Sequence, residues 1–193
     1  HKFFNYKKKF NKKKNRINLL VTSPTDFLLE KKLQLKKNFN VYYGYKINFN
    51  QIKKIIDKFD AWICHPSPKF IIDKNLLEKA KNLKIILTPS TGTNHISLID
   101  CKKRNIKVMS IRNNRYLKNI KASSEFSFTL LLAAFKNLYK GIIYGKAAHW
   151  RESEEHLRGN QLYGKTLGII GFGRIGSNLA KYANAFGMNV FVY

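Results

Sequence analysis

The sequence of 193 residues has few cysteines, few acidic residues and no long apolar segment. Its two cysteines, Cys64 and Cys101, form no Cys-x-x-Cys pair and have no histidine at metal-ligand spacing. We therefore expect no disulfide framework and no metal site, and a reducing cytoplasm fits best. Both thiols are expected to be small buried hydrophobes. The longest apolar run, residues 130–135, is far too short to cross a membrane, and no apolar core follows the basic start, so we predict neither a membrane span nor a secretory signal.

The scarcity of acidic residues leaves a formal net charge of +26, from 37 Lys and Arg against 11 Asp and Glu. Such a charge is typical of nucleic-acid-binding proteins. The lysines, however, are spread along almost every predicted helix and mixed with many Asn and Ile residues. This distribution favours a compositional bias of the genome over one shaped basic groove.

The densest basic block, residues 1–16, interleaves lysines with aromatic residues. Two interpretations are open: a tail that follows phosphates and stacks bases, or a solvated, weakly ordered lead-in. We favour the second, so nucleic-acid binding through this segment is the weaker alternative. The block contains Phe3, Phe4, Tyr6, Lys7, Lys8, Lys9, Phe10, Lys12, Lys13, Lys14 and Arg16.

The rest of the first half alternates between short apolar runs and helical patterns, and 44% of the chain is hydrophobic, enough for a real core. Such alternation predicts an α/β fold with a parallel sheet covered on both faces. We expect a flavodoxin-like substrate domain over residues 17–111. Its predicted strands are 17–22, 41–43, 61–64, 85–88 and 107–110, and its predicted helices are 25–37 (capped by Thr25), 50–58, 73–81 and 96–104.

The second half, residues 112–193, predicts the first half of a Rossmann domain. A long helix is expected over 122–139, capped by Ser123 or Ser124, followed by a polar, irregular or short-helical stretch over 141–159. A strand over 166–170, a helix over 174–186 and a strand over 189–193 complete the pattern.

The strongest motif is Gly171-x-Gly173-x-x-Gly176, which lies between that strand and that helix. Gly171 permits the tight turn, Gly173 lets a pyrophosphate approach the backbone, and Gly176 lets the helix pack closely on the strand. The amides of Arg174 and Ile175 then face the phosphates at the positive end of the helix. The acidic residue that binds the ribose is expected just beyond Tyr193, so the motif does not distinguish NAD from NADP.

A second loop, residues 90–96, lies between a predicted strand and a predicted helix. Successive amides around Gly92 at such a place form an anion site that suits a carboxylate. Taken alone, an ordinary capped turn is the better explanation of this loop.

Residues 157–176, which read Leu-Arg-Gly-Asn-Gln-Leu-Tyr-Gly-Lys-Thr-Leu-Gly-Ile-Ile-Gly-Phe-Gly-Arg-Ile-Gly, resemble the D-isomer-specific 2-hydroxyacid dehydrogenases. Residues 183–190 continue the resemblance, and residues 90–96 and 122–132 resemble the family's substrate-carboxylate loop and its crossing helix. The resemblance implies an NAD-dependent oxidoreductase acting on a small D-2-hydroxy or 2-oxo acid in a cleft between two domains. It also implies a homodimer formed through the helix near 122–139.

The resemblance assigns roles to individual residues. The loop containing Thr91, Gly92, Thr93 and Asn94 would bind the substrate carboxylate, and Thr91 would also touch the cofactor. Cofactor binding would fall to Gly171, Gly173, Arg174, Ile175 and Gly176 in the glycine motif.

The catalytic Arg, Glu and His of the family would lie beyond Tyr193, so the chain as given is expected to be inactive. Its own histidines are interpreted as structural or exposed: none has a carboxylate at an obvious partnering spacing, although His95 could line the cleft. A non-enzymatic dinucleotide sensor or corepressor-like protein of the same fold is the main alternative.

Two departures from the family pattern stand out. Residues 65–68 read His-Pro-Ser-Pro where phosphoglycerate-using relatives often carry an Arg, which argues against a phosphorylated substrate. Ser97 stands where an Asp is common, a change that affects only a helix cap.

Overall fold

The computed structural model describes residues 16–24, 29–112 and 115–193, and the chain divides into two compact units at a boundary before Arg115. Each unit is described by itself. Residues 1–15 of the basic block and the expected cap at Thr25 lie outside the described residues.

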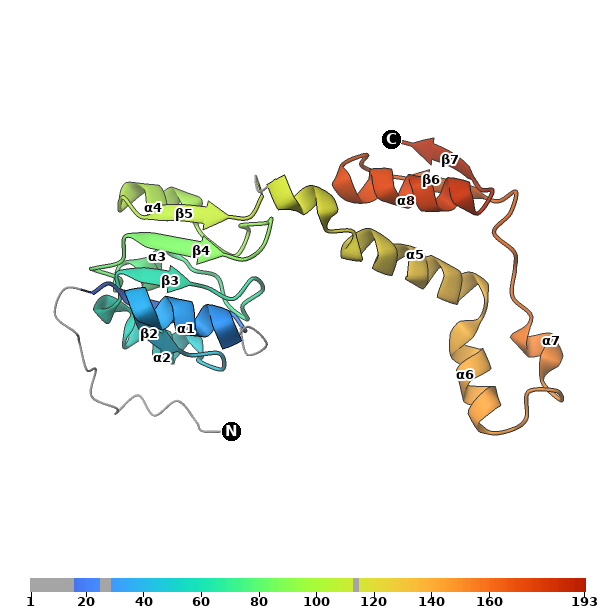
Figure 1. Cartoon of the computed structure of the whole chain (residues 1–193), viewed down its shortest axis with the longest axis horizontal. Helices are drawn as coiled ribbons and strands as arrows, with labels where there is room; N and C mark the ends of the chain where they lie inside the picture. The colour runs from blue at the N-terminus through green and yellow to red at the C-terminus, as the bar shows by residue number, and fades with distance from the viewer. Residues whose placement is uncertain (1–15, 25–28, 113–114) are drawn as a thin grey trace. The chain divides into compact units, whose positions relative to one another are not determined.

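The first unit contains a parallel five-stranded sheet in the order β2-β1-β3-β4-β5, which is the flavodoxin-like order (Figure 1). Every pair of neighbouring strands is parallel. The α/β class is therefore confirmed. The strands are β1 (Asn18–Val21), β2 (Asn40–Tyr43), β3 (Ala61–Ile63), β4 (Ile85–Thr88) and β5 (Lys107–Ser110).

Helices cover this sheet on both faces, as the continuous apolar character of its strands predicts. Leu20, Trp62 and Ile86 belong to the larger core, which includes residues of α2, α3 and α4. Leu19 and Val21 face the other way, toward Leu35 of α1. The helices are α1 (Leu29–Asn38), α2 (Phe49–Lys53), the 3-10 turn η1 (Ile56–Lys58), α3 (Lys74–Leu77) and α4 (Leu98–Lys103).

Side-chain caps fix where the helices of this unit begin. Asn48 and Gln51 form a reciprocal capping box at the start of α2, and the Asp73 carboxylate accepts from the Leu76 amide at the start of α3. The Ser97 hydroxyl accepts from the Asp100 amide at the start of α4, so the serine serves as a cap.

Two of the helices predicted from the sequence are much shorter in the structure. The segment 50–58 forms α2 and then the turn η1, and Ile52, Ile55 and Ile56 are nevertheless all buried. The predicted helix 73–81 ends at Leu77, after which turns bring further apolar side chains into the core. The spacing of apolar residues predicted correctly which side chains are buried, but it did not predict where the helices end.

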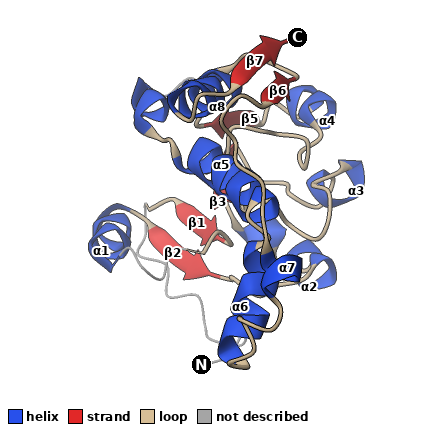
Figure 2. Cartoon of the chain, turned by 90° about the vertical axis from the view of Figure 1, so that its right-hand side faces the viewer, coloured by secondary structure: helices blue, strands red, loops and turns tan. Residues whose placement is uncertain are grey.

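The second unit pairs two parallel strands beside one long helix. Figure 2 shows β6 and β7 side by side next to α8. The Phe128 side chain of α5 packs edge-on against the ring of Tyr182 on α8 and against the ring of Phe186, which directly follows α8. These contacts pack α5 against α8. The elements are η2 (Arg115–Asn119), α5 (Ala122–Phe135), α6 (Leu138–Lys146), α7 (Glu154–Leu157), β6 (Thr166–Ile169), α8 (Arg174–Ala185) and β7 (Asn189–Val192).

The helix predicted over 122–139 is interrupted, and its predicted cap is wrong. Asn137 takes a left-handed conformation (φ 49°) between α5 and α6, and its side-chain amide donates to the Arg158 carbonyl oxygen at 2.7 Å. The N-cap is Lys121, because the helix already begins at Ala122; Ser123 and Ser124 lie inside it, and the buried Ser124 hydroxyl donates to the Ile175 carbonyl oxygen. At the carboxyl end of α5, a tertiary contact thus accompanies the break in the helical pattern.

No single helix among the described residues has the length and apolar character needed to cross a membrane. One pair, residues 115–135 with 138–146, meets the length and composition criteria together but is bent by 65° at its break.

Candidate functional site

The carboxyl ends of β1, β3 and β4 lie at one edge of the first unit's sheet, and the loops that follow them carry the candidate substrate residues. In an open parallel sheet, ligands bind outside the carboxyl ends of the strands, where the strand order reverses. Here β2 lies on one side of β1 and β3 lies on the other side of β1, so the strand order reverses between β1 and β3.

The predicted carboxylate loop follows β4 and is open to solvent. Thr91, Gly92 and Asn94 are exposed and Thr93 is half-buried. Within the described part of the chain, none of their four backbone N–H groups donates a hydrogen bond to another residue. The Thr93 carbonyl oxygen accepts from the Ile96 amide at 2.9 Å and closes the turn. These donors are therefore available to an anion.

A chain of hydrogen bonds from the core holds this loop in place. The Ser90 hydroxyl donates to the Gly92 carbonyl oxygen at 2.8 Å, and Thr88 Oγ1 lies 2.8 Å from Ser90 Oγ. Thr88 Oγ1 also lies 3.1 Å from His95 Nε2. Because the one Ser90 hydroxyl proton is used at Gly92, Thr88 donates to Ser90, and His95 must donate to Thr88 from Nε2. The geometry therefore selects the Nε2–H tautomer of His95.

His95 is buried beneath the loop rather than exposed in a cleft. Burial, together with the nearby charge of His65, lowers the pKa of His95 below its ordinary value. Its Nε2 atom also lies 3.7 Å from the Cys64 sulfur, whose pKa burial raises to about 11. His95 thus supports the loop from beneath, and its burial favours the uncharged imidazole.

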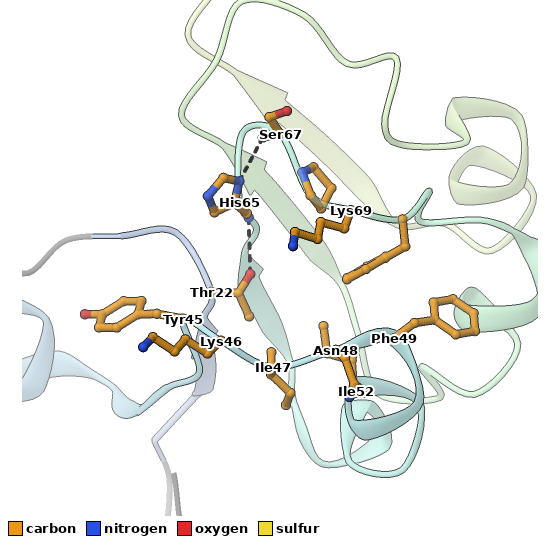
Figure 3. Close-up of a pocket in the computed structure, with 12 residues that line it drawn as sticks. Thr22, Tyr45, Lys46, Ile47, Asn48, Phe49, Ile52, His65, Ser67 and Lys69 are labelled. Atoms are coloured by element: carbon orange, nitrogen blue, oxygen red, sulfur yellow. Dashed lines mark hydrogen bonds between the residues drawn. The ribbon is translucent and has the colours of Figure 1, made fainter. Parts of the chain in front are cut away.

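A pocket of about 610 Å³ opens at the reversal point between β1 and β3. Figure 3 shows Thr22, at the end of β1, accepting a hydrogen bond from the His65 amide (3.2 Å) on one wall. In Figure 3 the Lys69 side chain extends beside His65, whereas the Lys46 side chain, in the loop after β2, lies beside Tyr45 and points away from Lys69. The lining residues are Thr22, Tyr45, Lys46, Ile47, Asn48, Phe49, Ile52, His65, Ser67, Pro68, Lys69 and Phe70.

The glycine motif of the second unit has the geometry that each of its glycines predicts. Gly171 has a φ of 94°, which a residue with a side chain rarely adopts. A β-carbon on Gly176 would collide with the Gly171 carbonyl oxygen and press on Ile169 at 3.1 Å. A β-carbon on Gly173 would meet nothing within 4 Å, so the space in front of this residue is open. That open space is where a phosphate approaches the backbone in such a turn.

The first turn of α8 presents free donors beside Gly173, its N-cap. The backbone N–H groups of Arg174 and Ile175 make no hydrogen bond to another described residue. Lys121 Nζ donates to Asn178 Oδ1 at 3.1 Å, and the Asn178 amide donates to the Arg174 carbonyl oxygen at 2.6 Å. The helix end is therefore anchored to the start of α5 while its amides stay available.

One prediction about the histidines, that none has a carboxylate partner, is wrong for His149. Contrary to the prediction that no histidine has a carboxylate partner, His149 Nδ1 lies 2.9 Å from a Glu152 carboxylate oxygen. Both side chains are well exposed, so solvent screens the pair. Over the residues that the structure describes, no group of three or more His, Cys, Asp and Glu side chains could hold a metal ion.

Sequence reasoning singled out the segment 65–68, which forms one wall of the pocket, but missed the pocket's two lysines. Lys46 and Lys69 lie in a chain full of lysines, and no motif marks them. The rule on strand reversal points to this place, but it applies only once the strand order is known.

Two family models cover most of the chain. Residues 20–115 match the D-isomer specific 2-hydroxyacid dehydrogenase, catalytic domain, and residues 128–193 match the NAD binding domain of the same family. A hydroxypyruvate reductase of Thermotoga maritima is 33% identical over 144 residues, which are 75% of this chain and 44% of the relative. A glyoxylate reductase of Thermococcus litoralis is 38% identical over 127 residues, or 63% of this chain and 37% of the relative. The chain thus spans less than half the length of these curated relatives.

Solved structures agree with this assignment. The TT0316 protein of Thermus thermophilus superposes with a TM-score of 0.77 at 28% identity, covering 91% of this chain and 55% of that one. The D-lactate dehydrogenase of Aquifex aeolicus, complexed with NAD and lactic acid, gives 0.72 at 28% identity, covering 91% and 50%. The chain belongs to the D-isomer specific 2-hydroxyacid dehydrogenase family.

Proposed function

We propose that this chain supplies the substrate-carboxylate loop and the cofactor phosphate site of an NAD-dependent oxidoreductase that interconverts a small D-2-hydroxy acid and its 2-oxo acid. The observation that carries the proposal is the glycine turn, in which Gly176 is closed to a side chain while Gly173 faces open space. Membership of a family whose second domain is described as NAD binding supports the same reading.

The residues of the second unit fit a dinucleotide. Gly173 leaves room for the pyrophosphate, and the amides of Arg174 and Ile175 are free to donate to its oxygens. The positive end of the α8 dipole adds attraction for the same charge. The cofactor, when bound, would supply the redox chemistry: NAD⁺ accepts a hydride at its nicotinamide ring and NADH donates one.

The loop after β4 is assigned to the substrate carboxylate. The free amides of Thr91, Gly92, Thr93 and Asn94 can donate to its oxygens, and the resemblance adds a contact from Thr91 to the cofactor. The buried support from His95 keeps the loop from collapsing. We assign the acid–base step neither to His95, which is buried beneath the loop, nor to His149, whose pair with Glu152 is exposed.

Self-association through α5 is part of the same proposal. Phe126 and Leu130 on this helix are 65% and 55% exposed, which is unusual for large apolar side chains one turn apart. Leu138 and Ile142 of α6 are also about half exposed. A second copy of the chain covering this face would bury these side chains.

A reducing location such as the cytoplasm is part of the proposal as well, because the thiols of Cys64 and Cys101 are free.

Titration of the chain with NADH, followed by the cofactor's fluorescence, tests the cofactor site. A chain of charge +26 attracts any polyanion, so the titration is run at about 0.15 M salt and compared across variants of equal charge. Gly173→Ala should weaken binding by about tenfold to 100-fold, because two charge-assisted hydrogen bonds are lost. Gly141→Ala, on α6 with open space around it, is the matched control and should bind as the original chain does. Equal binding by both variants would refute the assignment.

A further inference from the structure

One side-chain hydrogen bond closes a ring within the predicted carboxylate loop. The Ser90 hydroxyl donates to the carbonyl oxygen of Gly92, two residues further along the chain, at 2.8 Å. The ring closed by this bond contains the backbone between the two residues, and with it the N–H groups of Thr91 and Gly92. While the bond is intact, neither peptide group can turn freely. In the described part of the chain, neither of these successive N–H groups donates to another residue.

The backbone on both sides of this ring is anchored to neighbouring elements. The Ser90 carbonyl oxygen accepts from the Ile111 amide, just beyond β5, at 3.1 Å. On the other side, the His95 carbonyl oxygen accepts from the Ile72 amide, before α3, at 2.8 Å. The segment between these anchors depends on the Ser90 hydroxyl for the orientation of its first two peptide groups.

The direction of the hydrogen bonds beneath the ring decides whether it can close. A hydroxyl has one proton, so Ser90 can donate to Gly92 or to Thr88 but not to both. Thr88 Oγ1, which is fully buried, lies 2.8 Å from Ser90 Oγ and 3.1 Å from His95 Nε2. A proton on Nε2 makes His95 donate to Thr88 and Thr88 donate to Ser90, which leaves the Ser90 proton for Gly92. Without that proton Thr88 would donate to His95, Ser90 would donate to Thr88, and the ring would open.

The surroundings of His95 favour the direction that closes the ring. The Cys64 sulfur lies 3.7 Å from Nε2, but a thiol sulfur is a weak acceptor and competes poorly with the Thr88 oxygen. Uptake of a second proton in acid takes place at Nδ1, since Nε2 already carries one. His95 therefore donates to Thr88 in both of its charge states.

On the basis of the proposed function, we infer that Ser90, Thr88 and His95 are positioning residues for the substrate carboxylate. They hold the N–H groups of Thr91 and Gly92 in the orientation that binds it. Because these donors are ordered before the acid arrives, binding does not have to order them, and the affinity is higher. Loss of the Ser90 hydroxyl leaves both donors in the chain and removes only their orientation.

Titration of the ¹⁵N-labelled chain with oxamate, an unreactive mimic of a 2-oxo acid, tests this inference at the two donors themselves. The shifts of the Thr91 and Gly92 signals give the affinity, at about 0.15 M salt to screen the positive charge of the chain. Ser90→Ala should weaken binding by about threefold to tenfold, because one hydrogen bond no longer orders the ring. Ser90→Thr keeps the hydroxyl and should restore most of the affinity.

The ¹H–¹⁵N heteronuclear NOE of the same two signals, recorded without oxamate, is the second readout because it reports fast backbone motion. Its values should fall at Thr91 and Gly92 in Ser90→Ala and stay near those of the original chain in Ser90→Thr. Ser127→Ala removes a hydroxyl that donates to a carbonyl oxygen within α5, outside the loop. This control should change neither the affinity nor the NOE values.

The two residues beneath Ser90 are tested separately. Thr88→Val keeps nearly the same shape but removes the group that donates to Ser90, so it should also weaken oxamate binding. Thr88→Ser keeps the hydroxyl and should preserve binding. The imidazole ¹⁵N shifts of His95 identify the nitrogen that carries the proton, and they should place it on Nε2. A proton on Nδ1 alone would reverse the chain of donors and overturn the inference.

Equal oxamate affinity in Ser90→Ala and Ser90→Thr, or equal NOE values at Thr91 and Gly92 in these variants, overturns the inference. If oxamate still shifts both amides in that case, the proposed role of the loop stands without its positioning residues. If oxamate shifts neither amide in the original chain, the assignment of the loop to the substrate falls, and the inference falls with it.

Discussion

Gly176, in the first turn of α8, lies against the carbonyl group of Gly171, so closely that no β-carbon fits between them. This contact draws the helix onto the end of β6 and positions the free amides of its first turn. The two glycines therefore act on the site indirectly: one makes the turn and the other allows the close approach.

Gly176→Ala should destabilise the second unit by about 1–3 kcal/mol, because the added carbon meets backbone that cannot rotate away. Thermal unfolding followed by circular dichroism measures the loss. Gly173→Ala, three residues earlier, adds the same atom in open space and should unfold at nearly the same temperature as the original chain. A Gly176→Ala variant as stable as Gly173→Ala would show that the close packing is absent.

Both thiols should be nearly unreactive in the folded chain. Burial raises the pKa of Cys64 and of Cys101 to about 11, so the nucleophilic thiolate is scarce at neutral pH and is also covered. Alkylation by iodoacetamide, counted by mass spectrometry, should be slow without denaturant and fast in concentrated urea. Rapid labelling of either cysteine in the folded chain would contradict its burial.

The stability of the first unit should fall in mild acid because of His95. Burial lowers its pKa in the folded chain, while the unfolded histidine titrates near 6.5, so the unfolded state binds protons more readily between these two values. The stabilisation is complete above about pH 6.5 and is lost as the pH falls through the folded-state pKa.

Urea unfolding of the Trp150→Phe variant, followed by Trp62 emission at several pH values between about 5 and 8, measures this dependence. His95→Gln should flatten the curve, since its side chain does not titrate. His65→Gln, a half-buried histidine nearby, should leave most of the slope in place. An unchanged slope in His95→Gln would exclude the histidine as its source.

The proposed dimer depends on the apolar face of α5. Phe126→Glu combined with Leu130→Glu should shift the chain from dimer to monomer in sedimentation velocity, because each carboxylate would be desolvated in the interface. Ile99→Glu, at a 71% exposed apolar residue of α4, provides a control for an added carboxylate. If the double variant sediments as the original chain does, α5 is not the interface.

The fold was largely predictable from sequence because its signals are local. The strands over 85–88 and 107–110 appear with the predicted bounds, and the motif around Gly173 lies in the predicted turn between β6 and α8. In contrast, the break at Asn137 depends on a hydrogen bond to Arg158, which lies far away in sequence. No local pattern contains that information.

The candidate site was predictable in part for the same reason. The open loop around Gly92 and the free amides of α8 follow from the positions of glycines beside strands. The buried support from Thr88 and His95 depends on side chains meeting after folding. The pocket at the strand reversal depends on strand order, which brings the loops after β1, β2 and β3 to one edge of the sheet.

Backbone amide spectra of the ¹⁵N-labelled chain, recorded with and without NADH and oxamate (an unreactive mimic of a 2-oxo acid), test the central claim most directly. NADH should shift the amides of Arg174 and Ile175, and oxamate should shift those of Thr91 and Gly92, while signals of α6 stay in place. This outcome would place the cofactor and the carboxylate on the two loops to which we assign them. Shifts confined to other segments, or spread evenly over the exposed lysines, would contradict the claim.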